Sequence, residues 1–121
     1  MNNVLIVDDE AVILKILGTI LRKIDKVDIT EAQNGREALE KINDKRFSLI
    51  ITDLNMPELG GIELIKELRG SLKMNVPVFV MSGAKDIMIK DAVAAGASHI
   101  FKKPVNREEL TSQVKTLLNI A

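Results

Sequence analysis

Four apolar runs in this chain each end in a polar side chain of a kind that binds phosphate or metal ions. In chain order these polar residues are Asp8 with Asp9, Asp53, Ser82 and Lys103. Each run is short and rich in β-forming residues, which predicts a buried strand. Because the carboxyl ends of the strands in an open α/β sheet form the edge where ligands bind, we expect these side chains to converge on one site.

Asp53 is the residue on which we expect the chemistry to depend. It directly follows the apolar residues 49–52. A carboxylate can act as a nucleophile and form an acyl phosphate. The alternative is that Asp53 only caps the turn that Pro57 imposes four residues later.

The acidic pair Asp8 and Asp9 also has two interpretations. One is a helix cap with a first-turn acid, which the helix dipole favours. The other is a metal site, because these two carboxylates and Asp53 would repel one another at neighbouring strand ends. Mg²⁺ fits such a site, since it prefers carboxylate oxygens, keeps several waters and completes its shell with phosphate. A backbone carbonyl from the loop after Asp53 is a further ligand.

Lys103 and Ser82 are candidates for binding a phosphoryl group. A single Lys is most often a surface residue, but at a fixed strand end Lys103 can pair with a phosphoryl oxygen as a point charge. A cis bond between Lys103 and Pro104 would aim the ammonium inward. The Ser82 hydroxyl can donate to the same oxygens, or it can cap the next helix. Gly83 and Ala84 leave space for that approach, and the Gly83 N–H is another donor.

Strand-like and helix-like segments alternate five times, which predicts an α/β fold: a doubly wound parallel sheet with helices on both faces. Strands are expected at 4–7, 27–32, 49–52, 76–81 and 98–101. Helices are expected around residues 13–24, at 35–42, 61–69 and 86–95, and after an Asn106-x-x-Glu109 capping box. The apolar stripes of the first and last helices are Ile13, Ile16, Leu17, Ile20, Leu21, Ile24 and Leu110, Val114, Leu117, Leu118. Residues 1–121 then form one domain.

Composition excludes several functional classes. Seventeen basic residues balance seventeen acidic ones, so the electrostatic footprint of nucleic-acid binding is missing. No apolar stretch approaches the roughly 20 residues that cross a bilayer, and the N-terminus is unlike a signal peptide. The chain has no Cys, Trp or Tyr. We therefore expect a cytoplasmic protein that contacts neither nucleic acid nor membrane directly.

Taken together, the motifs resemble the receiver domain of two-component response regulators. They are Asp8-Asp9, Asp53, Met56-Pro57, Gly61, Ser82 and Lys103-Pro104. The resemblance spans the whole chain and implies the flavodoxin-like, five-stranded fold with strand order 2-1-3-4-5. It also implies that Asp53 accepts a phosphoryl group, and that Ser82, Gly83 and Lys103 contact that group. The implied Mg²⁺ ligands are Asp9, Asp53 and the backbone carbonyl of Asn55, with Asp8 acting through water.

The same resemblance identifies positions that tune the switch. Asn55 and Ala84 stand where receivers control the access of attacking water. Ile100 stands where the family usually has Tyr or Phe, and Phe101, the next residue, should face the opposite side of the sheet. We therefore expect a smaller, loop-centred rearrangement on phosphorylation. The expected output surface is the fourth helix, fifth strand and fifth helix, including Lys90, Ile100, Lys102 and the start of the last helix.

The leading functional hypothesis is a signalling switch rather than an enzyme that turns over a substrate. A histidine kinase or phosphotransfer protein would phosphorylate Asp53, and the output would be binding to another protein. A variant of this hypothesis is a receiver module excised from a larger regulator or hybrid kinase, against which the initiator-like Met1 argues mildly. The competing hypotheses are a flavodoxin-like FMN carrier and an aspartyl-phosphate phosphatase. The first lacks aromatic flanks, and the second would need an acid at position 55, which holds Asn.

Overall fold

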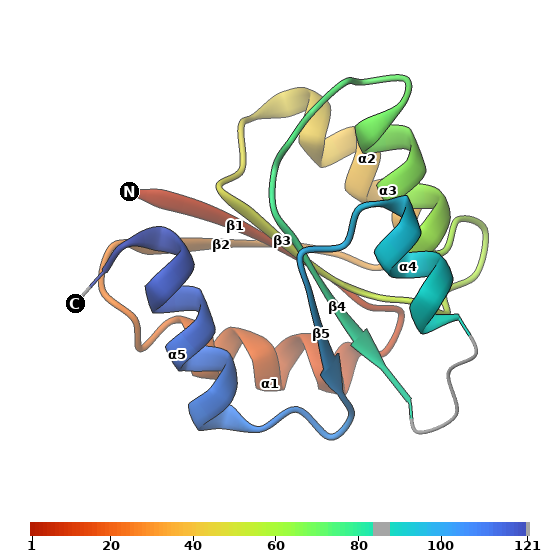
Figure 1. Ribbon diagram of the computed structural model, residues 1–121. Coiled ribbons are helices and arrows are strands. Elements are labelled where there is room, and N and C mark those ends of the chain that lie inside the picture. Colours follow the sequence, from red (N-terminus) through yellow and green to blue (C-terminus); the bar gives the residue numbers. More distant parts are fainter. Residues whose placement is uncertain (84–87, 121) are drawn as a thin grey trace.

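A five-stranded parallel sheet forms the centre of the molecule (Figure 1). Its strands are β1 (Asn2–Val7), β2 (Val27–Ala32), β3 (Leu49–Asp53), β4 (Val78–Ser82) and β5 (His99–Lys102). They lie in the order β2-β1-β3-β4-β5, and every adjacent pair is parallel. This confirms the predicted flavodoxin-like topology. The computed structural model describes residues 1–83 and 88–120.

Five helices cover the two faces of the sheet. They are α1 (Ala11–Leu21), α2 (Gly35–Asp44), α3 (Gly61–Arg69), α4 (Ile89–Ala95) and α5 (Arg107–Leu118). Figure 1 shows α1 and α5 together on one face and α2, α3 and α4 on the other. The chain therefore alternates strand and helix as predicted, which is the doubly wound arrangement.

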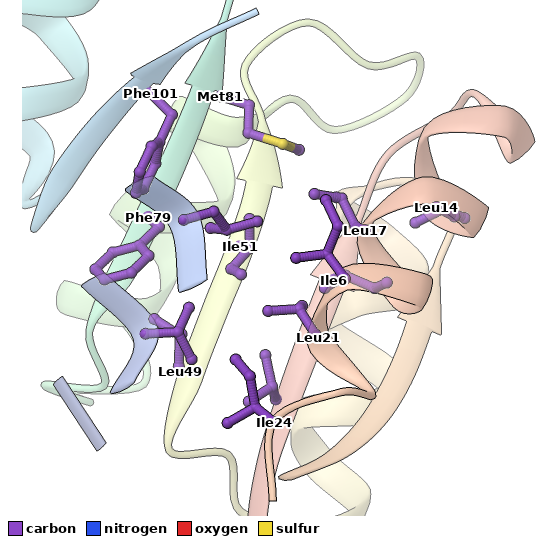
Figure 2. Close-up of a cluster of buried hydrophobic side chains, with 14 residues drawn as sticks. Ile6, Leu14, Leu17, Leu21, Ile24, Leu49, Ile51, Phe79, Met81 and Phe101 are labelled. Atoms are coloured by element: carbon purple, nitrogen blue, oxygen red, sulfur yellow. The ribbon is translucent and has the colours of Figure 1, made fainter. Parts of the chain in front are cut away.

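Each face has its own hydrophobic core, because successive strand residues point to opposite sides. Ile51, Phe79 and Phe101 point toward α1 and α5, where they meet Leu17 and Leu21 (Figure 2). The intervening strand residues pack against the other three helices. All residues of β3 and β4 are buried, as expected for central strands covered on both sides.

The register of the sheet aligns the carboxyl ends of the strands. Val7 pairs with Thr52, so Asp8 and Asp53 follow at the same level on neighbouring strands. Asp53 in turn pairs with Met81, which places Ser82 one residue farther along β4. The sheet itself thus brings together residues that lie far apart in the sequence.

Several predicted boundaries and burials are wrong. β4 begins at Val78 rather than at 76, after Pro77, which has no N–H for the ladder. Ile16 is 51% exposed and Leu117 is 37% exposed, because each helix buries a narrower stripe than the apolar spacing suggested. The predicted start of the fourth helix at Asp86 lies outside the described residues, and the helix is observed from Ile89.

The start of α5 agrees in part with its predicted capping box. The Asn106 side chain accepts a hydrogen bond from the Glu109 N–H at 2.9 Å. The Glu109 carboxylate, however, points to His99 on β5, with 3.8 Å between Oε1 and Nε2.

None of the helices in the described part of the chain combines the length and the apolar composition that a membrane span requires.

Candidate functional site

Asp8 is a fully buried carboxylate immediately after β1. Its backbone N–H continues the sheet by donating to the Ala32 carbonyl on β2, at 3.1 Å. Its Oδ1 accepts a hydrogen bond from the Glu10 N–H at 2.9 Å. Since Glu10 is the residue that precedes α1, Asp8 fixes the connection between the strand and the helix. The predicted helix cap is therefore wrong: Glu10 occupies the N-cap position without a side-chain cap hydrogen bond, and the first turn of α1 contains no acid.

Asp53 ends β3 and is 6% exposed. Its Oδ1 accepts from the Leu54 N–H at 2.9 Å, so the carboxylate turns back along its own loop. That loop is held tightly, because the Gly61 N–H donates to the Leu54 carbonyl at 3.0 Å. A Cβ at Gly61 would collide with the Asp53 backbone oxygen, which explains the glycine at this position.

Lys103 connects the two buried carboxylates. Its Nζ lies 3.2 Å from Asp53 Oδ2 and 3.4 Å from Asp8 Oδ2. The Lys103 N–H donates to the Ser82 carbonyl at 2.7 Å, which ties the residue to the end of β4. The Lys103–Pro104 peptide bond is cis, an isomer that Pro104 permits but does not require. The two carboxylate contacts show that the ammonium faces the site.

Burial and charge set the protonation of these three groups. Burial raises the pKa of Asp8 and of Asp53 above the ordinary value for aspartate. The Lys103 ammonium acts in the opposite direction on both carboxyls without cancelling the effect of burial. For Lys103 itself, burial lowers the pKa, but Asp53 and Asp8 together raise it above the ordinary value. The two carboxyls thus favour the charged form of the lysine, whereas burial disfavours the charged form of each carboxyl.

Ser82 ends β4 beside this cluster. It is 1% exposed, and its hydroxyl donates to the Gly83 carbonyl at 3.0 Å. Gly83 is exposed, and a Cβ added there would meet no atom within 4 Å. The two residues lie at the predicted edge of the sheet. Ala84, the other residue predicted there, lies outside the described residues.

Asp9 and Glu10 extend the acidic surface toward solvent. Both are exposed, and one carboxylate oxygen from each of Asp8, Asp9 and Glu10 lies within 4.8 Å of the others. From the sequence, Glu10 is interpreted as a first-turn acid and not as a metal ligand, although it directly follows Asp9. Oxygen donors of this kind suit Mg²⁺, and such an acidic group is typical of the Mg²⁺ site of receiver domains.

A groove of about 350 Å³ opens beside the acidic surface. The loop after β3 contributes much of its lining, including the exposed residue Asn55. The residues that line it are Asp9, Leu54, Asn55, Met56, Pro57, Gly60, Glu63 and Met88. Met56 and Met88 make part of this lining apolar. This feature could not be predicted from the sequence, because it depends on how the β3–α3 loop faces the start of α4.

Ile100 and Phe101 face opposite sides of β5, as predicted. Ile100 packs with the core beneath α3 and α4, and Phe101 belongs to the core beneath α1 and α5. Phe101 is in ring contact with His99, whose centroid lies 4.5 Å away, and with Phe79 at 5.4 Å. The aromatic ring at this end of the sheet is therefore on the α5 side and not at position 100.

Known proteins share this sequence pattern and fold. The chain is 36% identical to a transcriptional regulatory protein, the CpxR homolog of Haemophilus influenzae, over 98% of the chain and 51% of that protein. It is 31% identical to the autoinducer 2 sensor kinase/phosphatase LuxQ of Vibrio vulnificus, over 92% of the chain and 13% of that protein. The chain thus spans about half of the first relative and a much smaller share of the second.

A solved structure is similar to this chain in both fold and sequence. The chemotaxis response regulator CheY4 of Vibrio cholerae superimposes with a TM-score of 0.86 at 31% identity, over 97% of this chain and 98% of that one. Residues 4–115 match the model of the response regulator receiver domain. That match includes Asp8, Asp53, Ser82 and Lys103, the residues that the fold gathers at one edge. The chain belongs to the receiver domains of response regulators, which are components of two-component signalling.

Proposed function

We propose that this domain is a phosphorylation-dependent switch in which Asp53 accepts a phosphoryl group from a histidine kinase or phosphotransfer protein. The observation that supports this most directly is the Lys103 ammonium, 3.2 Å from Asp53 Oδ2 and 3.4 Å from Asp8 Oδ2 at the carboxyl edge of the sheet. A buried carboxylate with an adjacent cation is suited both to attack phosphorus and to hold the product.

The transfer forms one bond and breaks another. An Asp53 carboxylate oxygen attacks phosphorus, the bond from phosphorus to the donor imidazole nitrogen breaks, and the electron pair stays on the imidazole. Lys103 then pairs with a phosphoryl oxygen, and the Ser82 hydroxyl and Gly83 N–H donate to others. Mg²⁺, held by Asp9, Asp53, the Asn55 carbonyl and, through water, Asp8, would supply charge screening between the carboxylate and the phosphoryl group.

Loss of the phosphoryl group requires an attacking water at the same open edge. Asn55 is exposed there, and its amide can orient water. We propose that Asn55 and Ala84 set the lifetime of the phosphorylated state. The domain catalyses only its own phosphorylation and dephosphorylation.

The surface beside the site fits a protein phosphodonor. Val12 and Ile16, on the helix that follows Asp9, are 68% and 51% exposed. Beside them an apolar cavity of about 120 Å³ lies between α1 and the loop after β5, with Ile13, Pro104 and Val105 in its walls. Exposed apolar side chains next to a reactive carboxylate suit docking of a partner helix.

The output surface that we propose is the face formed by α4, β5 and α5. Lys90 and Lys102 are exposed on it, and Ile100 is half-buried and packs against the core. The balanced charge of the chain favours a protein target over nucleic acid or membrane. We propose that the domain accepts its phosphoryl group and binds its target in the cytoplasm. Since the CpxR homolog and LuxQ are longer than this chain, we propose as an alternative that the domain is the receiver module of a larger regulator or hybrid kinase.

Beryllofluoride, which takes the place of the phosphoryl group, tests this proposal. Fluorine NMR should show bound beryllofluoride in the wild type only when Mg²⁺ is present. The Asp53→Asn variant should not bind it, whereas Asp25→Asn, a change of the same kind at an exposed position, should bind like the wild type. Binding to Asp53→Asn at the wild-type level would overturn the proposal.

A further inference from the structure

Arg69, the last residue of α3, connects two backbone segments that lie far apart in the sequence. One guanidinium nitrogen donates to the Met74 carbonyl at 2.8 Å, and another donates to the Gly96 carbonyl at 2.9 Å. The first bond closes the turn after α3. The second reaches the residue that ends α4, which packs against α3 (Figure 1).

The C-terminal end of α4 depends on this contact. The last turn of the helix is Ala92-Val93-Ala94-Ala95, which offers no cation for the negative end of the helix dipole. Gly96 follows in the left-handed conformation, with a φ of 119°, and its N–H donates to the carbonyls of Ala92 and Val93. A Cβ at Gly96 would lie 2.8 Å from Arg69 Nε, so the glycine also permits the guanidinium to approach.

The next residues tie the same end of α4 to the sheet. The Ser98 N–H donates to the Val78 carbonyl at 2.8 Å. The Val78 N–H donates back to the Ser98 hydroxyl at 3.2 Å. The C-terminal end of the helix is therefore held by α3 on one side and by the first residue of β4 on the other.

The N-terminal end of α4 has no comparable side-chain clamp among the described residues. In the described part of the chain, Met88 precedes the helix in a helical conformation, and the first turn has no side-chain cap. This end lies toward the carboxyl edge of the sheet, where β4 ends at Ser82 (Figure 1). Among the described residues, the Arg69 bond thus ties down the end of the helix that is far from the site, and no side-chain cap holds the end that is near it.

We propose that Arg69 and Gly96 form a hinge clamp, about which α4 pivots when the site is phosphorylated. The clamp makes the N-terminal end of α4 move while its C-terminal end stays in place. This inference rests on the proposed function, because it needs a ligand at Asp53 to pull on the end of β4. It adds a positioning role for Arg69, a residue that touches none of the phosphoryl-binding side chains.

The motion can be measured with spin labels, because the chain has no native Cys. One label goes on α1 by Lys15→Cys, and the second goes on α4 by Lys90→Cys or Ala94→Cys; all three positions are exposed. Adding beryllofluoride with Mg²⁺ should change the 15–90 distance and leave the 15–94 distance unchanged. With Arg69→Met added, both distances should change. Equal changes in the two distances of the otherwise wild-type protein would overturn the hinge.

Amide hydrogen exchange of the ligand-free protein tests the clamp independently of phosphorylation. Exchange at Gly96 and Ala97 should become about tenfold faster or more in Arg69→Met, the factor expected on losing one hydrogen bond to a charged group. Arg22→Met, on the opposite side of the molecule, should leave it unchanged. If Arg69→Met does not fold, Arg69→Lys keeps the charge but cannot bond both carbonyls, and the same increase is expected.

Beryllofluoride binding and amide hydrogen exchange test the proposed function and the clamp separately. Absence of beryllofluoride binding would contradict the proposed function, while the exchange rates would still decide whether the clamp exists. Unchanged exchange at Gly96 and Ala97 in both Arg69 variants would overturn the clamp even if phosphorylation occurs.

Discussion

Lys103 reaches Asp53 across the end of the strand that separates them. Lys103 follows β5 and Asp53 ends β3, and β4 lies between these strands in the sheet. The 3.2 Å contact between Lys103 Nζ and Asp53 Oδ2 therefore passes the end of β4, where Ser82 is located. A phosphoryl group on Asp53 would meet both side chains without a rearrangement of the sheet.

The first prediction concerns Asp53 and pH. Burial raises its pKa in the folded protein above the ordinary 3.8. The folded state then binds more protons than the unfolded state in the range just above that value, so stability falls as pH rises through the folded-state pKa. Asp53→Asn should therefore be more stable than the wild type at pH 7, by on the order of 1 kcal/mol or about 4 °C in Tm.

The control for this experiment is Asp25→Asn, which removes an exposed carboxylate. Thermal unfolding followed by circular dichroism should show that the advantage of Asp53→Asn shrinks as pH falls toward 4 and the wild-type carboxyl becomes protonated. A difference that is constant with pH, or one equal to that of Asp25→Asn, would contradict this explanation.

The second prediction concerns Mg²⁺. A ligand that binds only the folded state raises the free energy of unfolding, by about 2.7 kcal/mol at 100 times its Kd. Calorimetry should show that Tm rises with Mg²⁺ concentration in the wild type. Asp9→Asn should lose most of this rise, because Asp9 is the exposed carboxylate beside buried Asp8. Asp28→Asn, at an exposed position on β2, should retain it, and an equal loss in both variants would rule out a specific site.

The third prediction concerns the phosphodonor surface on α1. Ile16→Glu places a charge on the exposed apolar surface next to the site. It should slow phosphotransfer from a kinase by about tenfold or more, since a well-packed contact residue often contributes over 1 kcal/mol. Labelling by a small phosphodonor should proceed at the wild-type rate. Thr116→Glu, on α5, is the matched control, and a parallel loss with both donors would show that the site itself was damaged.

The fourth prediction concerns the loop between β3 and α3. Glu58 has a φ of 69°, in the left-handed region that costs a residue with a side chain roughly 1 kcal/mol or more. Glu58→Gly should remove this strain and raise Tm by about 4 °C. Glu58→Ala loses the same 3.3 Å hydrogen bond from Asn34 but keeps the strain. It should give no gain, and equal Tm values for the two variants would show that backbone strain is not the cause.

Much of this site could be predicted because it depends on strand ends. The alternation of apolar runs and helical spacings located all five strands, and the parallel register then brings Asp8, Asp53 and Ser82 to one edge. Pro104 made a cis bond after Lys103 possible, but it could not determine the isomer. The strand order came from the resemblance to receiver domains, because the local pattern does not determine which strands pair.

Other features depend on packing between distant segments, which spacing does not encode. Ile16 has the same helical periodicity as Leu17, but only Leu17 lies on the stripe that meets the sheet. The bond from Arg69 to Gly96 joins residues 27 positions apart on two helices. The Glu109 carboxylate faces His99 rather than completing the capping box, because β5 places an imidazole beside the first turn of α5.

The central claim is that Asp53 is the phosphoacceptor, and chemical mapping of the phosphorylated residue tests it most directly. The protein is treated with a small phosphodonor and Mg²⁺, then with borohydride, which reduces an aspartyl phosphate to homoserine but leaves a free aspartate unchanged. Peptide sequencing by mass spectrometry should find homoserine at position 53. Homoserine at position 8 or 9, with aspartate intact at position 53, would contradict the account.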